Sequence, residues 1–374
     1  MPSKFALELR RQVGQLLIHG FDGTELTARL RSMLGTISPG GIILFKRNLV
    51  EAAQVHDLLH AAERCAGTPM FLCADVEGGS VDRLRDVIAP IPSVAEVAAS
   101  DSTRLFRKHG RLIGDEMRAL GFNTGFAPCL DLRFEASKNV LGSRTASDNP
   151  KQTIRFARDF LRGLHDAEVL GCGKHFPGLG EASLDSHDGL PVVEKSWKGM
   201  WNEDLLPYRE LHKSFPFIMV AHVAYPGVTR DKAPASLSKK WISDILRKKI
   251  GYRGLVLSDD LDMGGVLAAA SIEDAAIQTL LAGSEMMLVC QKEESVWRAY
   301  ETLYKRAEVD RKFARLVAER AARVLAYKNK SRELKLRPAP RPTQKTVDKL
   351  RCRVWEFTEE VRMTAMASAP EASL

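Results

Sequence analysis

The unit that decides the fold stands out in residues 151–174, which read KQTIRFARDFLRGLHDAEVLGCGK. The first part, Lys151–Ala167, repeats its apolar side chains at helical spacing, and the second part, Val169–Lys174, is a short continuous apolar run. Such a run is typical of a strand buried on both faces. A helix followed by this kind of strand predicts one unit of a parallel β/α repeat.

The same unit recurs along the chain. Helical patterns such as Asn48–Cys65, Ser102–Leu120 and Leu237–Ile250 separate eight apolar runs, which are Gln15–Gly20, Gly41–Phe45, Met70–Asp75, Gly125–Asp131, Val169–Lys174, Phe217–His222, Leu255–Asp259 and Met286–Cys290. Eight alternating units without a central break predict an α/β protein with a (β/α)8 TIM-type barrel. The alternative is a doubly wound open sheet, but its polar residues would cluster at one switch point, whereas here they end nearly every run.

The chain continues beyond the eighth run as a C-terminal helical extension. We expect residues 1–335 to form the barrel domain, which ends in a long charged helix near Glu293–Lys330. Residues 336–374 should then form a Pro-rich break at Leu336–Pro342, a helix at Gln344–Met363, and a small-residue tail at Ala365–Leu374 that frays.

Composition excludes several classes of protein. The 374 residues carry a formal charge of +8 that is dispersed along the chain, and no basic helix interleaved with aromatic residues predicts nucleic-acid binding. No apolar run reaches the roughly 18 residues that a membrane span needs, and Met1–Arg11 lacks a signal-peptide pattern, so we expect a cytoplasmic protein. No nucleotide motif is present, so we expect no cofactor. The sequence does not determine the oligomeric state, and a monomer is the default expectation.

The cysteines are expected to be reduced core residues. Four of the six lie inside apolar runs and no Cys-x-x-Cys pair occurs; the four are Cys73, Cys129, Cys172 and Cys290.

The ends of the runs carry the polar residues that predict a site. In a barrel of this kind, side chains at the carboxyl ends of the strands face the active site. Several such side chains together indicate a pocket that holds a hydroxyl-rich ligand by many hydrogen bonds and offers a carboxylate to its centre. The candidates are Asp75, Arg83, Arg144, Lys174, His175, His222 and Asp259.

The loop after the fifth run is the most informative segment. Residues 174–187 read KHFPGLGEASLDSH, in which Gly178 and Gly180 allow the loop to move over a pocket. Asp185 and His187 stand two positions apart, so in an extended backbone they lie on the same side. The carboxylate would then hold one imidazole nitrogen and leave the other for general acid/base catalysis near neutral pH.

Structural roles compete with these assignments. Asp259 could cap the following helix, as could Ser258 or Asp260, and Lys174 could be a simple ion-pair partner at the barrel rim. Asp75 could close a turn, and His222 could be either a core or a site residue. The three carboxylates Asp259, Asp260 and Asp262 also suggest a cation site, but no further ligand pattern supports a metal.

Five segments in this order resemble glycoside hydrolase family 3, and in particular its single-domain bacterial β-N-acetylhexosaminidases of peptidoglycan recycling. They are DVEGG (75–79), FAPCLD (126–131), KHFPG (174–178) with DSH (185–187), AHVAYP (221–226) and SDDL (258–261). The resemblance spans roughly Gln15–Cys290.

This resemblance implies retaining cleavage of a terminal β-linked N-acetylglucosamine from muropeptide fragments. By it, Asp259 matches the nucleophile, His187 matches the acid/base, and Asp185 orients that histidine. The sugar-binding set is matched by Asp75, Arg83, Arg144, Lys174 and His175. The chain departs from the family pattern at Leu179, where a His is usual, and at Ser80, where an Arg is common.

Other functions stay open at this point. A phosphorylase of the same sugar is one, because a neutral histidine would let anionic phosphate approach where a carboxylate would repel it. A sugar-binding protein with weakened turnover is another, suggested by Leu179 and Ser80. A β-glucosidase or β-xylosidase of the same family is the nearest enzymatic alternative.

Overall fold

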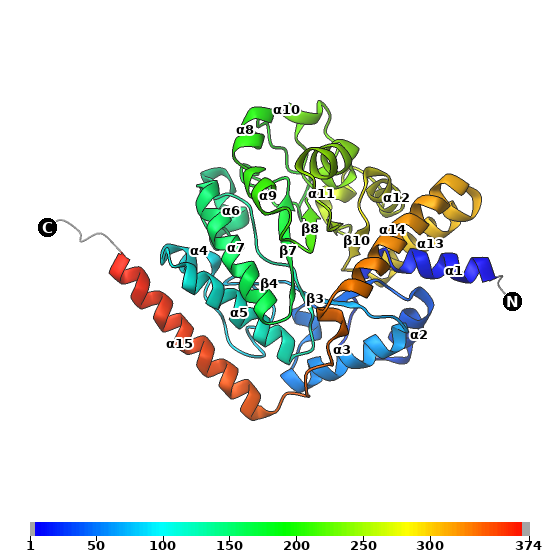
Figure 1. Cartoon of the computed structure of the whole chain (residues 1–374). Coiled ribbons are helices and arrows are strands. Elements are labelled where there is room, and N and C mark those ends of the chain that lie inside the picture. The colour runs from blue at the N-terminus through cyan, green and yellow to red at the C-terminus, as the bar shows by residue number, and fades with distance from the viewer. Residues whose placement is uncertain (1–3, 369–374) are drawn as a thin grey trace.

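The computed structural model describes residues 4–368, in which eight parallel strands close into a barrel (Figure 1). Strand β1 completes the ring by pairing with β10, with Leu17 opposite Met287. The predicted (β/α)8 fold is therefore confirmed. The barrel strands are β1 (Leu17–His19), β2 (Gly41–Ile43), β3 (Phe71–Ala74), β6 (Thr124–Gly125), β7 (Leu170–Phe176), β8 (Phe217–Val220), β9 (Leu255–Asp260) and β10 (Met286–Val289).

Helices surround the barrel (Figure 1). The main ones are α1 (Lys4–Gly14), α2 (Ala28–Ile37), α3 (Ala52–Ala66), α4 (Val94–Ala99), α5 (Thr103–Ala119), α7 (Pro150–Asp166), α8 (Trp197–Asn202), α9 (Leu206–Leu211), the π-helix η5 (Lys240–Ile250), α12 (Ile272–Ala282), α13 (Glu293–Val309), α14 (Arg311–Lys330) and α15 (Gln344–Ser368). A short antiparallel hairpin, β4 (Val76–Gly78) and β5 (Val81–Asp82), follows β3.

Side chains of the strands alternate between the barrel interior and the helix layer. In β3, Phe71 and Cys73 belong to the interior cluster, whereas Leu72 and Ala74 pack in the outer core. This alternation fills the barrel, because successive side chains of a strand point to opposite faces. All six cysteines are free, and the four inside apolar runs are buried as predicted, but Cys65 is only half-buried and Cys352 is exposed, so the core prediction is wrong for these two.

The fourth strand is shorter than the predicted run Gly125–Asp131, because β6 covers only Thr124–Gly125. Pro128 has no backbone N–H to offer to a ladder. The chain nevertheless stays beside β7, since the Leu130 N–H donates to the Lys174 carbonyl at 2.6 Å. Residues that follow the strand therefore still reach the rim of the barrel.

The prediction of a single long helix over Glu293–Lys330 is wrong. The segment forms two helices, α13 and α14, which break at Asp310. The Asp310 carboxylate accepts the backbone N–H groups of Lys312 and Phe313, so this residue caps α14. The broken helix lets α14 return beside α1, as Figure 1 shows.

The predicted C-terminal helix is present and ends five residues later than Met363. Helix α15 continues through Ala365 to Ser368, and the rest of the tail that was expected to fray lies outside the described residues. Its inner face packs on the outer core beside α4 and α5, through Val347, Leu350, Val354, Phe357 and Val361. No helix within residues 4–368 has the length and apolar character needed to cross a membrane.

Phe357 anchors α15. Its ring is buried and stacks on His109 of α5, with ring centroids 5.6 Å apart. We expect Phe357→Ala to lower the free energy of unfolding by about 3–5 kcal/mol, because it leaves a cavity under the helix. Trp355→Ala is the matched control, since Trp355 is 66% exposed and its loss should change stability by about 0.5 kcal/mol or less. Urea unfolding of both variants checks this, and equal effects would contradict it.

Candidate active site

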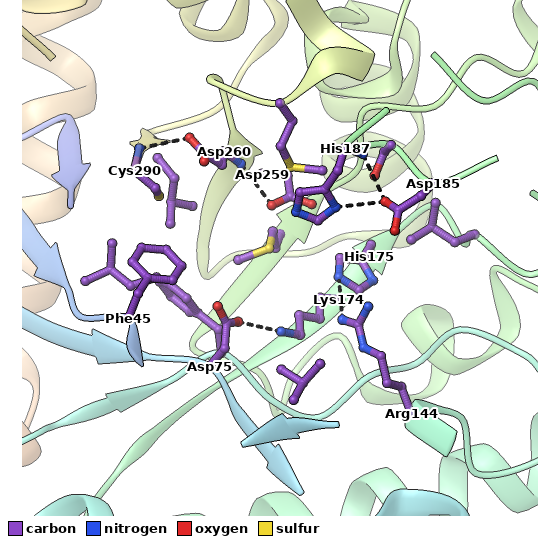
Figure 2. Close-up of a pocket in the computed structure, with 18 of the residues that line it drawn as sticks. Phe45, Asp75, Arg144, Lys174, His175, Asp185, His187, Asp259, Asp260 and Cys290 are labelled. Carbon is purple, nitrogen blue, oxygen red and sulfur yellow. Dashed lines mark hydrogen bonds and ion pairs between the residues drawn. The ribbon is translucent and has the colours of Figure 1, made fainter. Parts of the chain in front are cut away.

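One cavity of about 140 Å³ lies among the carboxyl ends of the strands and opens to solvent. Side chains from β7 and β9, and from the segments that follow β3 and β7, face into it (Figure 2). The eight side chains that the sequence assigned to catalysis or sugar binding all line this cavity. They are Asp75, Arg83, Arg144, Lys174, His175, Asp185, His187 and Asp259.

Asp259 is the penultimate residue of β9 and is half-buried. Its carboxylate Oδ1 accepts the Asp260 N–H at 2.9 Å. The interpretation of Asp259 as a helix cap is wrong, because the next helix, α11 (Gly264–Leu267), has Met263 at its N-cap. The Asp259 carboxylate is thus held at the cavity wall by the strand itself.

Asp185 and His187 form the predicted pair at the cavity edge (Figure 2). His187 Nδ1 lies 2.8 Å from Asp185 Oδ1, and the His187 N–H donates to the same oxygen at 2.9 Å. Burial alone would raise the pKa of Asp185, but the bonds from His187 outweigh it and hold the pKa below its usual range. Because Nδ1 is occupied, Nε2 is the nitrogen left for a ligand, and the His187 side chain is 68% exposed.

A buried ionic cluster forms the floor of the cavity (Figure 2 labels three of its members). Lys174 Nζ lies 2.7 Å from Asp75 Oδ1 and 2.6 Å from Glu77 Oε1. Arg144 grips both oxygens of Glu77 from the other side, each at 2.9 Å. Lys174 is therefore an ion-pair partner, which was the alternative role considered for it from the sequence. Its side chain also lines the cavity.

The cluster keeps its carboxyl groups ionised. Burial would raise the pKa of Glu77, but the charges of Arg144 and Lys174 outweigh it and lower the pKa far below its usual range. Burial likewise opposes ionisation of Asp75, whose pKa Lys174 and Arg83 hold down. The floor thus offers fixed charges to a ligand's hydroxyl groups.

A hydrogen bond to Asp131 fixes the His175 ring. His175 Nδ1 lies 2.7 Å from Asp131 Oδ2, while its Nε2 lies 3.3 Å from Arg144. The same carboxylate accepts the Leu179 N–H at 2.7 Å and lies 3.1 Å from Cys129 Sγ. Cys129, Asp131 and His175 are also close enough together to hold a metal ion, although Asp131 is already engaged by hydrogen bonds.

The two residues that depart from the family pattern, Leu179 and Ser80, lie in different environments. Leu179 is buried and lines the cavity, where its side chain adds apolar wall. Ser80 is exposed and is not among the lining residues. Arg83 does line the cavity, and within residues 4–368 its buried Nε has no hydrogen-bond partner.

The remaining candidates, His222, Asp260 and Asp262, form hydrogen bonds within the protein. His222 is buried between the Ser236 hydroxyl and the Asp260 carbonyl, at 2.7 and 2.9 Å. The Asp260 and Asp262 carboxylates accept backbone N–H groups, and among residues 4–368 they do not form, with Asp259, a group close enough together to hold a metal ion.

Sequence reasoning did not select Glu77 or Asp131 for the site. Both lie inside segments that were quoted for their family pattern, and both lie next to selected residues in space. The available signal was chemical: a buried lysine or arginine requires a carboxylate partner.

Comparison with known proteins identifies the family. The model of the glycosyl hydrolase family 3 N-terminal domain matches residues 8–327. The chain belongs to glycosyl hydrolase family 3. This glycoside hydrolase is 36% identical over 282 residues to a β-hexosaminidase of Idiomarina loihiensis, covering 74% of this chain and 84% of the relative. It is 37% identical over 282 residues to a β-hexosaminidase of Pseudomonas aeruginosa, covering 75% of this chain and 84% of the relative.

Solved structures agree with this family assignment. A family 3 β-N-acetylglucosaminidase from a Paenibacillus species superposes with a TM-score of 0.89 at 32% identity, over 94% of this chain and 68% of the other. A β-N-acetylhexosaminidase from Beutenbergia cavernae superposes with a TM-score of 0.78 at 25% identity, over 86% of this chain and 98% of the other. The resemblance inferred from the five segments is confirmed at the level of the family.

The ionic floor should make this family 3 enzyme sensitive to acid. Because the pKa values of Glu77 and Asp75 are lower folded than unfolded, their contribution to stability is present above the unfolded values and is lost as the pH falls. Glu77→Gln should lower the free energy of unfolding by about 3–5 kcal/mol at pH 7, because two buried cations lose a shared partner. The deficit relative to wild type should shrink towards pH 3.5.

Urea unfolding at both pH values measures this effect. The matched control is Glu360→Gln, because Glu360 also pairs with two cations, Arg104 and Lys108, but at the surface. That variant should lose about 1 kcal/mol or less. A Glu77→Gln deficit that is small, or that does not change with pH, would count against the buried cluster as the source.

Proposed function

We propose that this enzyme hydrolyses terminal β-linked N-acetylglucosamine with retention of configuration. The observation that carries the proposal is the arrangement around one cavity of a strand-end carboxylate, a His–Asp pair and an ionic floor. The sugar itself is suggested by the names of the relatives, which are β-hexosaminidases and β-N-acetylglucosaminidases.

The first half of the reaction forms a covalent intermediate. Asp259 attacks the anomeric carbon while His187 Nε2 gives its proton to the departing glycosidic oxygen, so the aglycone leaves as an alcohol. Asp185 holds Nδ1 at 2.8 Å, which fixes the direction of Nε2.

The second half releases the sugar. Neutral His187 takes a proton from water, whose oxygen attacks the anomeric carbon and frees the Asp259 carboxylate. During both halves, Asp75, Lys174, His175, Arg144 and Arg83 would bind the ring substituents. The unpartnered Arg83 Nε supports this role, because a buried donor without a partner costs free energy until a ligand accepts its hydrogen bond.

The finer parts of the proposal are the natural substrate and its location. We propose muropeptide fragments of the cell wall as substrates, cleaved in the cytoplasm. Release of N-acetylglucosamine from purified fragments, with and without their peptides, tests the first part, and cell fractionation tests the second.

The nucleophile is tested by Asp259→Asn. We expect turnover of the nitrophenyl β-N-acetylglucosaminide to fall at least about 10³-fold, because an amide cannot form the glycosyl ester. The matching glucoside should be a poor substrate of the wild type. Turnover of neither sugar by wild type would favour a sugar-binding protein, and turnover of the glucoside alone would favour a β-glucosidase.

The acid/base is tested by His187→Ala. We expect kcat/KM on a glycoside with a poor leaving group to fall roughly 10² to 10⁴-fold. A dinitrophenyl glycoside should lose less, since its leaving group needs no proton. Equal losses on both substrates would remove His187 from this role.

Phosphate separates hydrolysis from phosphorolysis. A histidine in place of a second carboxylate also suits an anionic acceptor, so the reaction is run with and without inorganic phosphate. We expect free N-acetylglucosamine in both cases. Formation of the sugar 1-phosphate would show that the enzyme is a phosphorylase and would contradict hydrolysis as its activity.

A further inference from the structure

The turn after the nucleophile strand is fixed to its neighbour β10. Asp260 Oδ1 accepts the N–H groups of Cys290 and Asp262, at 2.9 and 3.0 Å. Asp262 Oδ2 accepts those of Gln291 and Lys292, at 3.0 and 3.2 Å. Two carboxylates, each held by two backbone donors, make this turn a rigid platform beside the cavity.

The loop that carries the His–Asp pair rests on this platform. Helix α11 begins directly after the turn, and its first two N–H groups point at the loop. Gly265 donates to the Ser186 carbonyl at 2.8 Å, and Gly264 donates to the His187 carbonyl at 3.2 Å. The acid/base residue is therefore bonded through its own backbone to the segment that follows the nucleophile.

Only glycine fits at these two contacts. A Cβ atom on Gly264 would lie 2.5 Å from the His187 carbonyl oxygen, and one on Gly265 would lie 2.9 Å from the Ser186 oxygen. Both obstacles are backbone atoms, so no rotamer change can relieve them. A side chain at either position must push the loop away.

The tip of the loop has little else to hold it. In the described part of the chain, the other hydrogen bonds of residues 183–189 are internal, from His187, Asp188 and Gly189 back to Asp185. These bonds shape the tip without attaching it to the barrel. Its hydrogen-bonded attachment consists of the two bonds to α11.

We propose that Gly264 and Gly265 are positioning residues that set the distance between His187 and Asp259 by docking the acid/base loop on α11. The inference rests on the proposed function, since it assumes that His187 delivers a proton to a bond that Asp259 attacks. Neither glycine lines the cavity, so neither touches the substrate. They act through the backbone of the loop.

The test compares two leaving groups in Gly264→Ala. We expect kcat/KM for the phenyl β-N-acetylglucosaminide to fall at least about tenfold, because a misplaced imidazole donates its proton poorly. The dinitrophenyl glycoside should lose less than about threefold, because it needs no proton. Leu267→Ala is the control in the same helix, since its side chain is 43% exposed, and it should leave both values unchanged. If Gly264→Ala does not fold, Gly265→Ala replaces it, because its clash is the milder one.

Amide hydrogen exchange gives a readout that needs no activity. Residues 183–189 should exchange faster in Gly264→Ala than in wild type, while the barrel strands stay protected as before. Equal losses on both substrates, or unchanged kinetics, would overturn the inference, and so would unchanged exchange of the tip. Inactivity of the wild type would instead reject the proposed function, and the exchange result alone would then decide whether the glycines dock the loop.

Discussion

Closure of the barrel is the constraint on which the rest of the structure depends. Pairing of β1 with β10 brings the first and last strands into one ring, so all eight carboxyl ends share a single rim. Residues as far apart in the chain as Asp75 and Asp259 then face the same cavity. The cavity needs no dedicated domain, because the ring of strands already supplies the geometry.

The ionic floor shows how the protein manages buried charge. Lys174 and Glu77 are almost fully removed from water, which is costly for each ion alone. The cost is offset because every charge meets its opposite at hydrogen-bond distance, in the order Asp75, Lys174, Glu77, Arg144. The same arrangement that stabilises the floor also presents charges in fixed positions, so binding a sugar needs little rearrangement there.

Much of the fold was predictable because it depends on local pattern. Apolar runs bounded by helices identified all eight strands, and the polar ends of those runs together with the loops after them identified eight side chains that line one cavity. Element boundaries were less predictable. The break at Asp310 depends on a cap that looks like any other charged residue in a charged stretch, and β6 covers only Thr124–Gly125 although backbone bonds to β7 continue as far as Leu130. Periodicity reports neither feature.

The parts of the site that escaped prediction depend on contacts across the barrel. Asp131 holds His175, and Glu77 joins Lys174 to Arg144, but no spacing in the sequence reveals which strand ends will face each other. The docking of the His187 loop on Gly264 is of the same kind, since it is a backbone contact between distant segments.

The stacking of Phe357 on His109 has a consequence for the cavity floor. His109 Nε2 would lie 3.0 Å from a Cβ on Gly78, and Gly78 belongs to the hairpin that carries Glu77. An unbroken series of packed groups thus runs from the outer helix α15 to the carboxylate in the cavity floor. A change of side-chain volume on the inner face of α15 would therefore reach the cavity floor through packed groups, although that face lies outside the barrel, whereas a change at the exposed Trp355 would not.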